Sequence, residues 1–312
     1  MTYRTLIADH LADEAGALLR EAGIDVETRT GLAEADLVAT VPGFHAILVR
    51  SAVRVTARVF EAAADLKVVG RAGTGVDNVD VVAATARGVL VMNVPGGNTV
   101  TVAEHTIALI LAMARRIPEA DASLRAGQWE RGRFTGFELT GKTLGIIGFG
   151  QVGRAVAERA LGLKMHVAAF DPLVSSFVME GEGVRPVATI EELLALCDVV
   201  TVHTPADARG LICKDVLSRA RRGVMIVNCA RGGVVDEEAL AEALRSGQVG
   251  GAAVDVFDHE PPKDSPLLAA PNVVLTPHLG ASTREAQTRV AIAIAEQVRD
   301  FLLHGRRQGA VN

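Results

Sequence analysis

Short apolar runs alternate with amphipathic stretches along most of the chain. In the first third, apolar runs lie at 5–8, 46–49, 67–69 and 89–92, and helical spacing is found at 11–22 and 55–64. Continuous apolar runs predict strands that are buried on both faces, and their alternation with helices predicts a parallel sheet. A segment rich in proline and glycine at 93–97 interrupts this rhythm.

A second alternating series follows a long helical pattern at about 99–116 and a polar stretch at 128–133. Its predicted strands lie at 144–147, 166–170, 198–202, 223–227, 252–254 and 273–275, and a last helix is expected at about 283–303. The two series together predict an α/β protein with two doubly wound, Rossmann-like parallel sheets.

Composition narrows the class of protein. The 312 residues are 49% hydrophobic and 22% charged, which is typical of globular domains rather than a disordered chain. A net charge of −5 disfavours a nucleic-acid partner. The longest clean apolar run, 107–114, is too short to span a bilayer, and the three cysteines have no metal-binding spacing. With no signal-like start, we expect a cytoplasmic protein without a metal or a membrane partner.

A GxGxxG sequence, with Gly148, Gly150 and Gly153, follows the strand expected at 144–147 and opens a helix. In this context the first glycine permits a tight turn and the second lets backbone approach a pyrophosphate. The third lets helix and strand pack closely, and the helix N-terminus offers N–H groups to the phosphates. The motif predicts a dinucleotide site, and the alternative is a glycine-rich turn that binds nothing.

Asp171 ends the next predicted strand, 18 positions after Gly153. A carboxylate there accepts hydrogen bonds from an adenosine ribose and repels a 2′-phosphate, so the sequence favours NAD over NADP. The alternative is an aspartate that caps the following turn.

Three further residues follow the last predicted strands. Arg231, Glu260 and His278 would lie together, because the carboxyl ends of parallel strands meet at one edge of the sheet. An acid, a base and a fixed cation near a nicotinamide are what hydride transfer to a 2-keto acid requires. Taken singly, each residue is more often structural or solvated, so the prediction depends on their joint position.

Four segments resemble the D-isomer-specific 2-hydroxyacid dehydrogenases, and among them the D-3-phosphoglycerate dehydrogenases most closely. They are GRAGTGVDNVD at 70–80, the turn at 148–153, NCARGGVVD at 228–236 and PHLGAST at 277–283. The resemblance covers nearly the whole chain. It implies a discontinuous substrate domain, 1–97 plus 284–312, around an NAD-binding Rossmann domain at 98–283. It also implies a homodimer built on the first long helix of the NAD-binding domain.

The resemblance assigns roles to the three residues at the strand ends. Arg231 would hold the substrate carboxylate and polarise the 2-keto group, His278 would be the general acid/base on the C2 oxygen, and Glu260 would be its partner. The physical chemistry agrees, because a carboxylate at one ring nitrogen raises the pKa of histidine and determines its tautomer.

The resemblance also implies a set of binding residues. The expected NAD contacts are Gly148, Gly150, Gln151, Val152, Gly153, Asp171, Pro172, His203, Thr204, Pro205, Cys229, Ala230, Asp255, His278 and Gly280. The expected substrate contacts are Arg50, Ser51, Arg71, the backbone N–H groups of Ala72 and Gly73, Arg131 of the partner subunit, and Arg231. The cations Arg50, Arg71 and Arg131 resemble phosphate-facing positions, although solvated surface is the alternative for each.

Three departures from the family pattern stand out. The loop at 204–210 is shorter than usual, which puts its contacts to adenine in doubt. Lys164 stands where relatives usually carry glycine, and because lysine at positive φ is strained, we expect that turn to differ. The sequence stops at Asn312, so we expect a short form without the regulatory extension of many relatives and without serine feedback through it.

The function that the resemblance implies is NAD-dependent oxidation of 3-phospho-D-glycerate to 3-phosphohydroxypyruvate, which opens serine biosynthesis. Hydroxypyruvate, glyoxylate or sulfolactate could fit the same cationic pocket. An alternative of another class is an NAD-sensing, protein-binding module of the co-repressor type, which shares this fold and these three residues.

Overall fold

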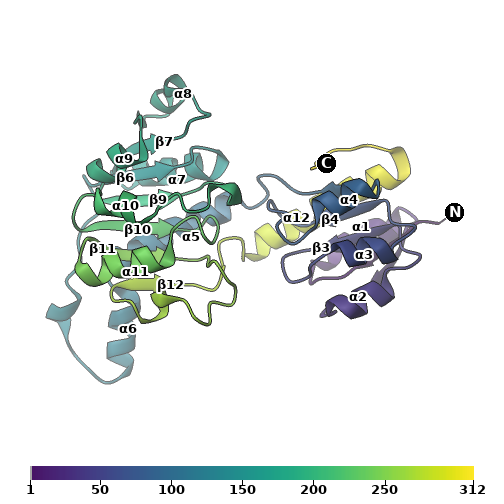
Figure 1. The fold of residues 1–312 in the computed structure, drawn as a ribbon, viewed down its shortest axis with the longest axis horizontal. Helices are drawn as coiled ribbons and strands as arrows, with labels where there is room; N and C mark the ends of the chain where they lie inside the picture. Colours follow the sequence, from purple (N-terminus) through teal and green to yellow (C-terminus); the bar gives the residue numbers. More distant parts are fainter. Residues whose placement is uncertain (1) are drawn as a thin grey trace. The chain divides into compact units, whose positions relative to one another are not determined.

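The computed structural model describes residues 2–312, which form two compact units (Figure 1). The first unit comprises the chain up to Asn98 together with Ala281–Asn312, and the second comprises Thr99–Gly280. These limits lie one and three residues from the domain limits expected from the sequence.

The first unit contains a five-stranded parallel sheet in the order β2-β1-β3-β4-β5. Its strands are β1 (Arg4–Ile7), β2 (Asp25–Thr28), β3 (Ala46–Val49), β4 (Val68–Arg71) and β5 (Leu90–Met92). Its helices are α1 (Asp13–Glu21), α2 (Glu34–Thr40), α3 (Ala57–Ala62), α4 (Val81–Ala86) and α12 (Arg284–His304). Helices α1 and α12 bury apolar side chains on one face of the sheet, and α2, α3 and α4 do so on the other.

The second unit contains a seven-stranded sheet in the order β12-β11-β10-β9-β6-β7-β8, again with parallel pairing throughout. Its strands are β6 (Thr143–Ile147), β7 (His166–Phe170), β8 (Arg185–Pro186), β9 (Val199–Val202), β10 (Val224–Asn228), β11 (Val249–Val254) and β12 (Val273–Leu275). The chain order reverses between β6 and β9, and the crevice beyond the carboxyl ends of strands at such a point is where doubly wound sheets bind ligands.

Helices cover both faces of this second sheet. The helices of this unit are α5 (Thr99–Ala114), α6 (Ile117–Arg125), α7 (Gln151–Gly162), α8 (Ser176–Gly181), α9 (Ile190–Leu196), α10 (Lys214–Ser218) and α11 (Glu237–Ser246). Helix α6 projects away from the sheet (Figure 1) and buries only Ser123. The core under α5 and α7 includes Leu109, Ile110 and Val156, whereas α9, α10 and α11 pack on the opposite face. None of the described helices is both long and apolar enough to cross a lipid bilayer.

The prediction of two parallel α/β sheets is confirmed, and burial explains why. All four residues of β3 and of β9 are buried, as a strand covered by helices on both faces requires. Strand β2 was not predicted from the pattern. It lies at the edge of its sheet, where none of its residues is fully buried, so its sequence DVET needs no apolar run.

We expected the lysine at position 164 to change the turn after α7. It does not, because Lys164 adopts the left-handed conformation that a glycine would adopt there, with φ of 63°. The N–H of Met165 donates to the carbonyl of Ala160, and the N–H of Lys164 donates to that of Leu161. These two bonds are the Schellman ending of a helix, which satisfies carbonyls that the helix leaves open. The buried side chain of Met165 packs in the adjoining core and holds the turn in place despite the lysine.

We expect Lys164→Gly to stabilise the protein, because glycine adopts positive φ without the steric cost that a Cβ brings. The greater entropy of glycine in the unfolded chain offsets part of this effect. The net increase in the free energy of unfolding is about 1 kcal/mol, or roughly 2–4 °C in the midpoint of thermal unfolding. Lys164→Ala is the matched control, since it removes the side chain and keeps the Cβ. Equal midpoints for the two variants would show that the backbone is not strained there.

Candidate active site

Three polar side chains follow three adjacent strands of the second sheet. Arg231 lies three residues after β10, Glu260 six residues after β11, and His278 three residues after β12. These strands are neighbours in the order β12-β11-β10 and are parallel, so their carboxyl ends share one edge. The structure therefore brings these three segments to the same edge of the sheet.

His278 and Glu260 form a direct pair. The Nδ1 atom of His278 lies 2.8 Å from Oε2 and 3.0 Å from Oε1 of Glu260. The hydrogen bond to Glu260 raises the pKa of His278 above its ordinary value of 6.5, against the opposing effect of burial. Because Nδ1 is engaged, Nε2 is the ring nitrogen available to exchange a proton with a bound molecule.

Glu260 stays ionised beside this histidine. Burial opposes its ionisation, but the hydrogen bond and charge of His278 and the N–H of Phe257 outweigh burial, and the pKa of Glu260 is lowered. The ion pair therefore stabilises the fold only between the two pKa values. Its contribution is lost as the pH falls through that of Glu260 or rises through that of His278.

The loop that carries His278 is held by Asp255, which directly follows β11. His278 has a left-handed backbone with φ of 54°, and its N–H donates to the carbonyl of Asp255. The carboxylate of Asp255 is fully buried and accepts hydrogen bonds from the N–H groups of Leu279 and Gly280, at 2.7 and 2.8 Å. Asp255, which the resemblance assigns to NAD contact, thus shapes the loop of the candidate acid/base.

Arg231 is half-buried and belongs to a segment that packs closely against the segment of Glu260. A Cβ added at Gly232 would lie 1.8 Å from the carbonyl oxygen of Phe257, so only glycine fits between them. The side-chain amide of Asn228 donates to the carbonyl of Arg231 at 3.0 Å, and its oxygen accepts from the N–H of Ala230. The positive charge of Arg231 also acts to lower the pKa of His278.

In the glycine-rich turn between β6 and α7, the chain's own atoms require glycine at two of the three glycine positions. Gly148 has φ of 93°, and a Cβ there would lie 2.6 Å from the carbonyl oxygen of His203. A Cβ at Gly153 would lie 2.2 Å from the carbonyl oxygen of Gly148, so helix and turn touch there. At Gly150 a Cβ would meet nothing within 4 Å, which leaves that face open to a ligand.

Asp171 follows β7 and is tied to this turn. Its two carboxylate oxygens accept hydrogen bonds from the N–H groups of Phe149, at 2.7 Å, and Leu173, at 2.8 Å. It therefore caps the turn that follows β7, the alternative considered above. Each oxygen keeps a further lone pair for a ribose hydroxyl, so the two roles are compatible.

His203, Thr204 and Pro205 follow β9, on the other side of the switch in strand order. Burial lowers the pKa of His203 to about 4, so its ring is neutral at pH 7. The hydroxyl oxygen of Thr204 is buried, and no hydrogen-bond partner is found for it among residues 2–312. A buried hydroxyl in that state is a candidate ligand contact.

The loop at 204–210, which we expect from the sequence to be short for the family, folds toward the candidate active site. The two terminal guanidinium nitrogens of Arg209, Nη1 and Nη2, donate to the carboxylate of Asp258, and the N–H of Gly210 donates to the carbonyl of Gly233 at 2.7 Å. The loop is thereby tied to the segments that follow β10 and β11.

The remaining expected NAD contacts lie near these segments. Gln151 and Val152 open α7, Pro172 follows Asp171, Cys229 and Ala230 are buried directly after β10, and Gly280 is buried at the end of the loop. Burial raises the pKa of Cys229 to about 12, so it is a neutral thiol.

The expected substrate contacts other than Arg131 and Arg231 belong to the first unit. Arg50 and Ser51 follow β3 and Arg71 ends β4, and these strands are parallel neighbours. The guanidinium of Arg71 lies across Gly73, where a Cβ would be 1.8 Å from Nη1. The N–H groups of Ala72 and Gly73 donate to the carbonyls of Val49 and Arg71, so both are already engaged within the chain.

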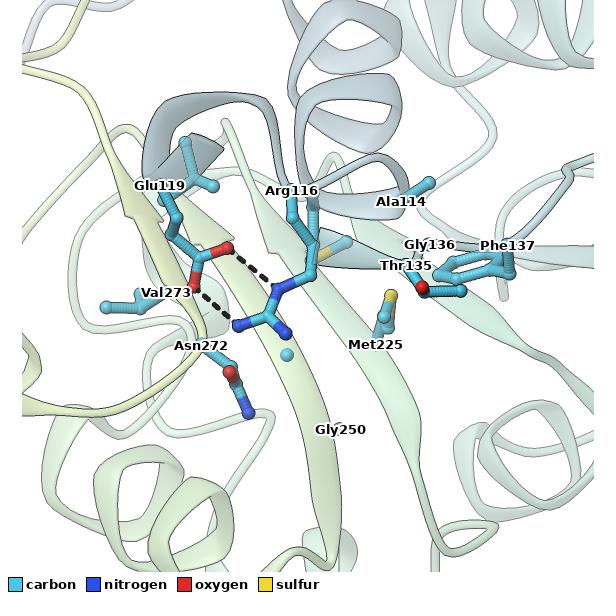
Figure 2. Close-up of a pocket in the computed structure, with 13 residues that line it drawn as sticks. Ala114, Arg116, Glu119, Thr135, Gly136, Phe137, Met225, Gly250, Asn272 and Val273 are labelled. Carbon is cyan, nitrogen blue, oxygen red and sulfur yellow. Dashed lines mark hydrogen bonds and ion pairs between the residues drawn. The ribbon is translucent and has the colours of Figure 1, made fainter. Parts of the chain in front are cut away.

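A separate cavity of about 240 Å³ lies at the opposite, amino-terminal edge of the second sheet (Figure 2). Arg116 forms two hydrogen bonds with Glu119 there, at 2.9 and 3.1 Å, beside Asn272 and Gly250. The sequence did not single out this cavity. Because it lies at the other ends of the strands, it is distinct from the candidate active site.

Comparison with known proteins gives concordant findings. A family profile described as "D-isomer specific 2-hydroxyacid dehydrogenase, NAD binding domain" matches residues 107–280. The chain is 51% identical over 298 residues to a D-3-phosphoglycerate dehydrogenase of Archaeoglobus fulgidus, covering 95% of this chain and 56% of that protein. It is 47% identical over 311 residues to the human D-3-phosphoglycerate dehydrogenase, covering 99% and 58%. The chain thus spans less than two thirds of the length of these relatives.

Among solved structures, the TT0316 protein of Thermus thermophilus is similar over its full length. It shares 38% identity with this chain at a TM-score of 0.90, and the match covers 99% of this chain and 100% of that one.

We expect Glu260→Gln to lower the pKa of His278, because glutamine keeps an acceptor for Nδ1–H and removes the charge that favours the imidazolium. An NMR titration of the histidine ring resonances measures this directly. His304, exposed at the end of α12, serves as the internal reference. A His278 midpoint that stays at its wild-type value would mean that the pair is absent in solution.

Proposed function

Because the chain belongs to the D-isomer specific 2-hydroxyacid dehydrogenase family, we propose that it is an NAD-dependent oxidoreductase that converts 3-phospho-D-glycerate to 3-phosphohydroxypyruvate. The observation that carries this proposal is the pair formed by His278 and Glu260, 2.8 Å apart at the strand edge that also bears Arg231. The names of the relatives at 51% and 47% identity support the choice of substrate. The reaction would then open serine biosynthesis.

The turn between β6 and α7 fits NAD. Gly150 leaves room for a pyrophosphate, the first N–H groups of α7 would donate to it, and the hydroxyl of Thr204 is a buried group in need of a partner. Asp171 would accept hydrogen bonds from the adenosine ribose and repel a 2′-phosphate. NAD, when bound, accepts a hydride from C2 of the substrate.

Proton transfer falls to His278. As C2 loses hydride, Nε2 of His278 takes the proton of the C2 hydroxyl, which leaves a ketone and an imidazolium. Glu260 stabilises that imidazolium through the hydrogen bond at Nδ1. In the reverse direction the imidazolium returns the proton to the oxygen.

Arg231 is assigned to the substrate carboxylate. Its planar guanidinium can bind a carboxylate through two parallel hydrogen bonds, and its charge helps to polarise the neighbouring C2 oxygen. The hydrogen bonds from Asn228 to its segment and the tight approach at Gly232 support a preset position for it.

The terminal phosphate is assigned to Arg50 and Arg71 of the first unit and to Arg131 of a partner subunit in a homodimer. Arg131 is exposed at the start of the 3-10 helix η1 (Arg131–Phe134). The preceding α6 and loop expose Ile117, Leu124 and Trp129 by 53%, 58% and 77%. Apolar side chains of this size in solvent support an interface between two copies of the chain.

NAD reduction across a panel of 2-hydroxy acids tests the proposal. We expect turnover with 3-phospho-D-glycerate above that with D-glycerate, glycolate and sulfolactate, and a preference for NAD over NADP. His278→Asn should lower kcat by about 10²–10⁴-fold because it removes the proton acceptor, and it should leave the affinity for NAD nearly unchanged because the turn at 148–153 still holds the cofactor. Wild-type turnover in His278→Asn would contradict the assignment, and no turnover with any acid would favour the protein-binding alternative.

The phosphate assignment makes a sharper prediction. Arg71→Ala should raise KM for 3-phospho-D-glycerate by roughly 10–150-fold, the value of one charge-assisted contact, and leave KM for D-glycerate nearly unchanged. Arg58→Ala, which removes an exposed side chain on helix α3 of the same unit, is the matched control for lost surface charge. An equal loss on both substrates would mean that Arg71 serves the fold or the carboxylate.

A further inference from the structure

The backbone of His278 requires an outside restraint. Its φ of 54° lies in the left-handed region, which a residue with a Cβ adopts only when its surroundings impose it. The N–H groups of the next two residues, Leu279 and Gly280, donate to the carboxylate of Asp255. The direction in which the ring of His278 points therefore depends on where that carboxylate is held.

The carboxylate of Asp255 has four donors in contact and no exposed surface. Besides the two N–H groups, the hydroxyl of Thr276 donates to Oδ1 at 2.5 Å, and Nε2 of His105 lies 3.2 Å from the same oxygen. A buried carboxylate is stable in its ionised form only when donors or an opposite charge replace the lost water. Burial by itself raises the pKa of Asp255, but these donors outweigh burial and the pKa is lowered.

His105 is distinct among these four donors. It lies on α5, a helix outside the loop, whereas Thr276, Leu279 and Gly280 belong to the same short segment as His278. Its Nε2 is also 3.2 Å from the hydroxyl oxygen of Thr276, so one ring nitrogen lies within hydrogen-bond distance of both oxygens. The side chain is largely buried, with 18% of its surface exposed.

We propose that His105 is a positioning residue for the reaction: through Asp255 and Thr276 it connects α5 to the loop at 276–280 and sets the orientation of His278. The inference rests on the proposed function for its kinetic consequence. Its structural part, the orientation of the His278 ring toward Glu260, stands without any substrate. The charges of the Glu260 and His278 side chains also act on the carboxylate of Asp255 through space.

The test compares two substitutions that differ in reach. His105→Gln places an amide nitrogen near the former position of Nε2, whereas His105→Asn leaves its amide short of Asp255. We expect His105→Asn to lower kcat by about 10–100-fold, as small displacements of a reacting group do, with less than a twofold change in the dissociation constant of NAD. His105→Gln should recover most of kcat. His166→Asn, at the exposed start of β7, is the matched control.

An NMR titration separates this inference from the proposed function. In His105→Asn the pKa of His278 should move toward its ordinary value, because a displaced loop weakens the hydrogen bond to Glu260. That measurement needs no turnover, so it remains decisive even if no 2-hydroxy acid is a substrate. If His105→Asn does not fold, Thr276→Val breaks the same network from the loop side and is read in the same way.

The outcomes are distinct. An unchanged His278 pKa with unchanged kcat in His105→Asn overturns the inference. A loss of kcat that His105→Gln does not recover, or one matched by an equal loss of NAD affinity, also overturns it, because a merely structural role would give that result.

Discussion

The buried carboxylate of Asp255 is the group on which the geometry of the active site depends. It lies one residue beyond β11 and draws the N–H groups of Leu279 and Gly280 toward itself. That pull bends the chain at His278 into a left-handed conformation, and the bend presents Nδ1 to Glu260. A buried carboxylate is stable as an ion only when hydrogen-bond donors replace the lost water, and His105 supplies the one such contact among these four that comes from outside the loop.

Close approach between segments supplies the rest of the arrangement. Glycine at 232 lets the Arg231 segment touch the carbonyl of Phe257, and glycine at 153 lets α7 touch the turn at Gly148. In both cases a Cβ would overlap a backbone oxygen, which is more costly to move than a flexible side chain. The parallel register of β10, β11 and β12 then brings three segments, distant in sequence, to one edge.

Much of this was predictable, and the failures have physical causes. Strands buried on both faces were found from their apolar residues: β3 is a continuous apolar run, and in β9 only Thr201 interrupts the valines. Strand β2 was missed because an edge strand needs none. Lys164 was expected to change its turn, yet packing and two hydrogen bonds impose the left-handed conformation. The site residues could be named from strand ends and resemblance, but the four donors around Asp255 depend on tertiary contacts that no local pattern encodes.

The pH dependence of kcat/KM in both directions of the proposed reaction tests the account most directly. Oxidation needs His278 neutral to accept the hydroxyl proton, whereas reduction needs it charged to donate one. Because Glu260 raises the pKa of His278, the account predicts that oxidation increases and reduction decreases through an apparent pKa above 6.5. D-glycerate and hydroxypyruvate serve as reference substrates, since neither has a phosphate that titrates in this range. Profiles that rise or fall together in the two directions would contradict the assignment of His278 as the acid/base.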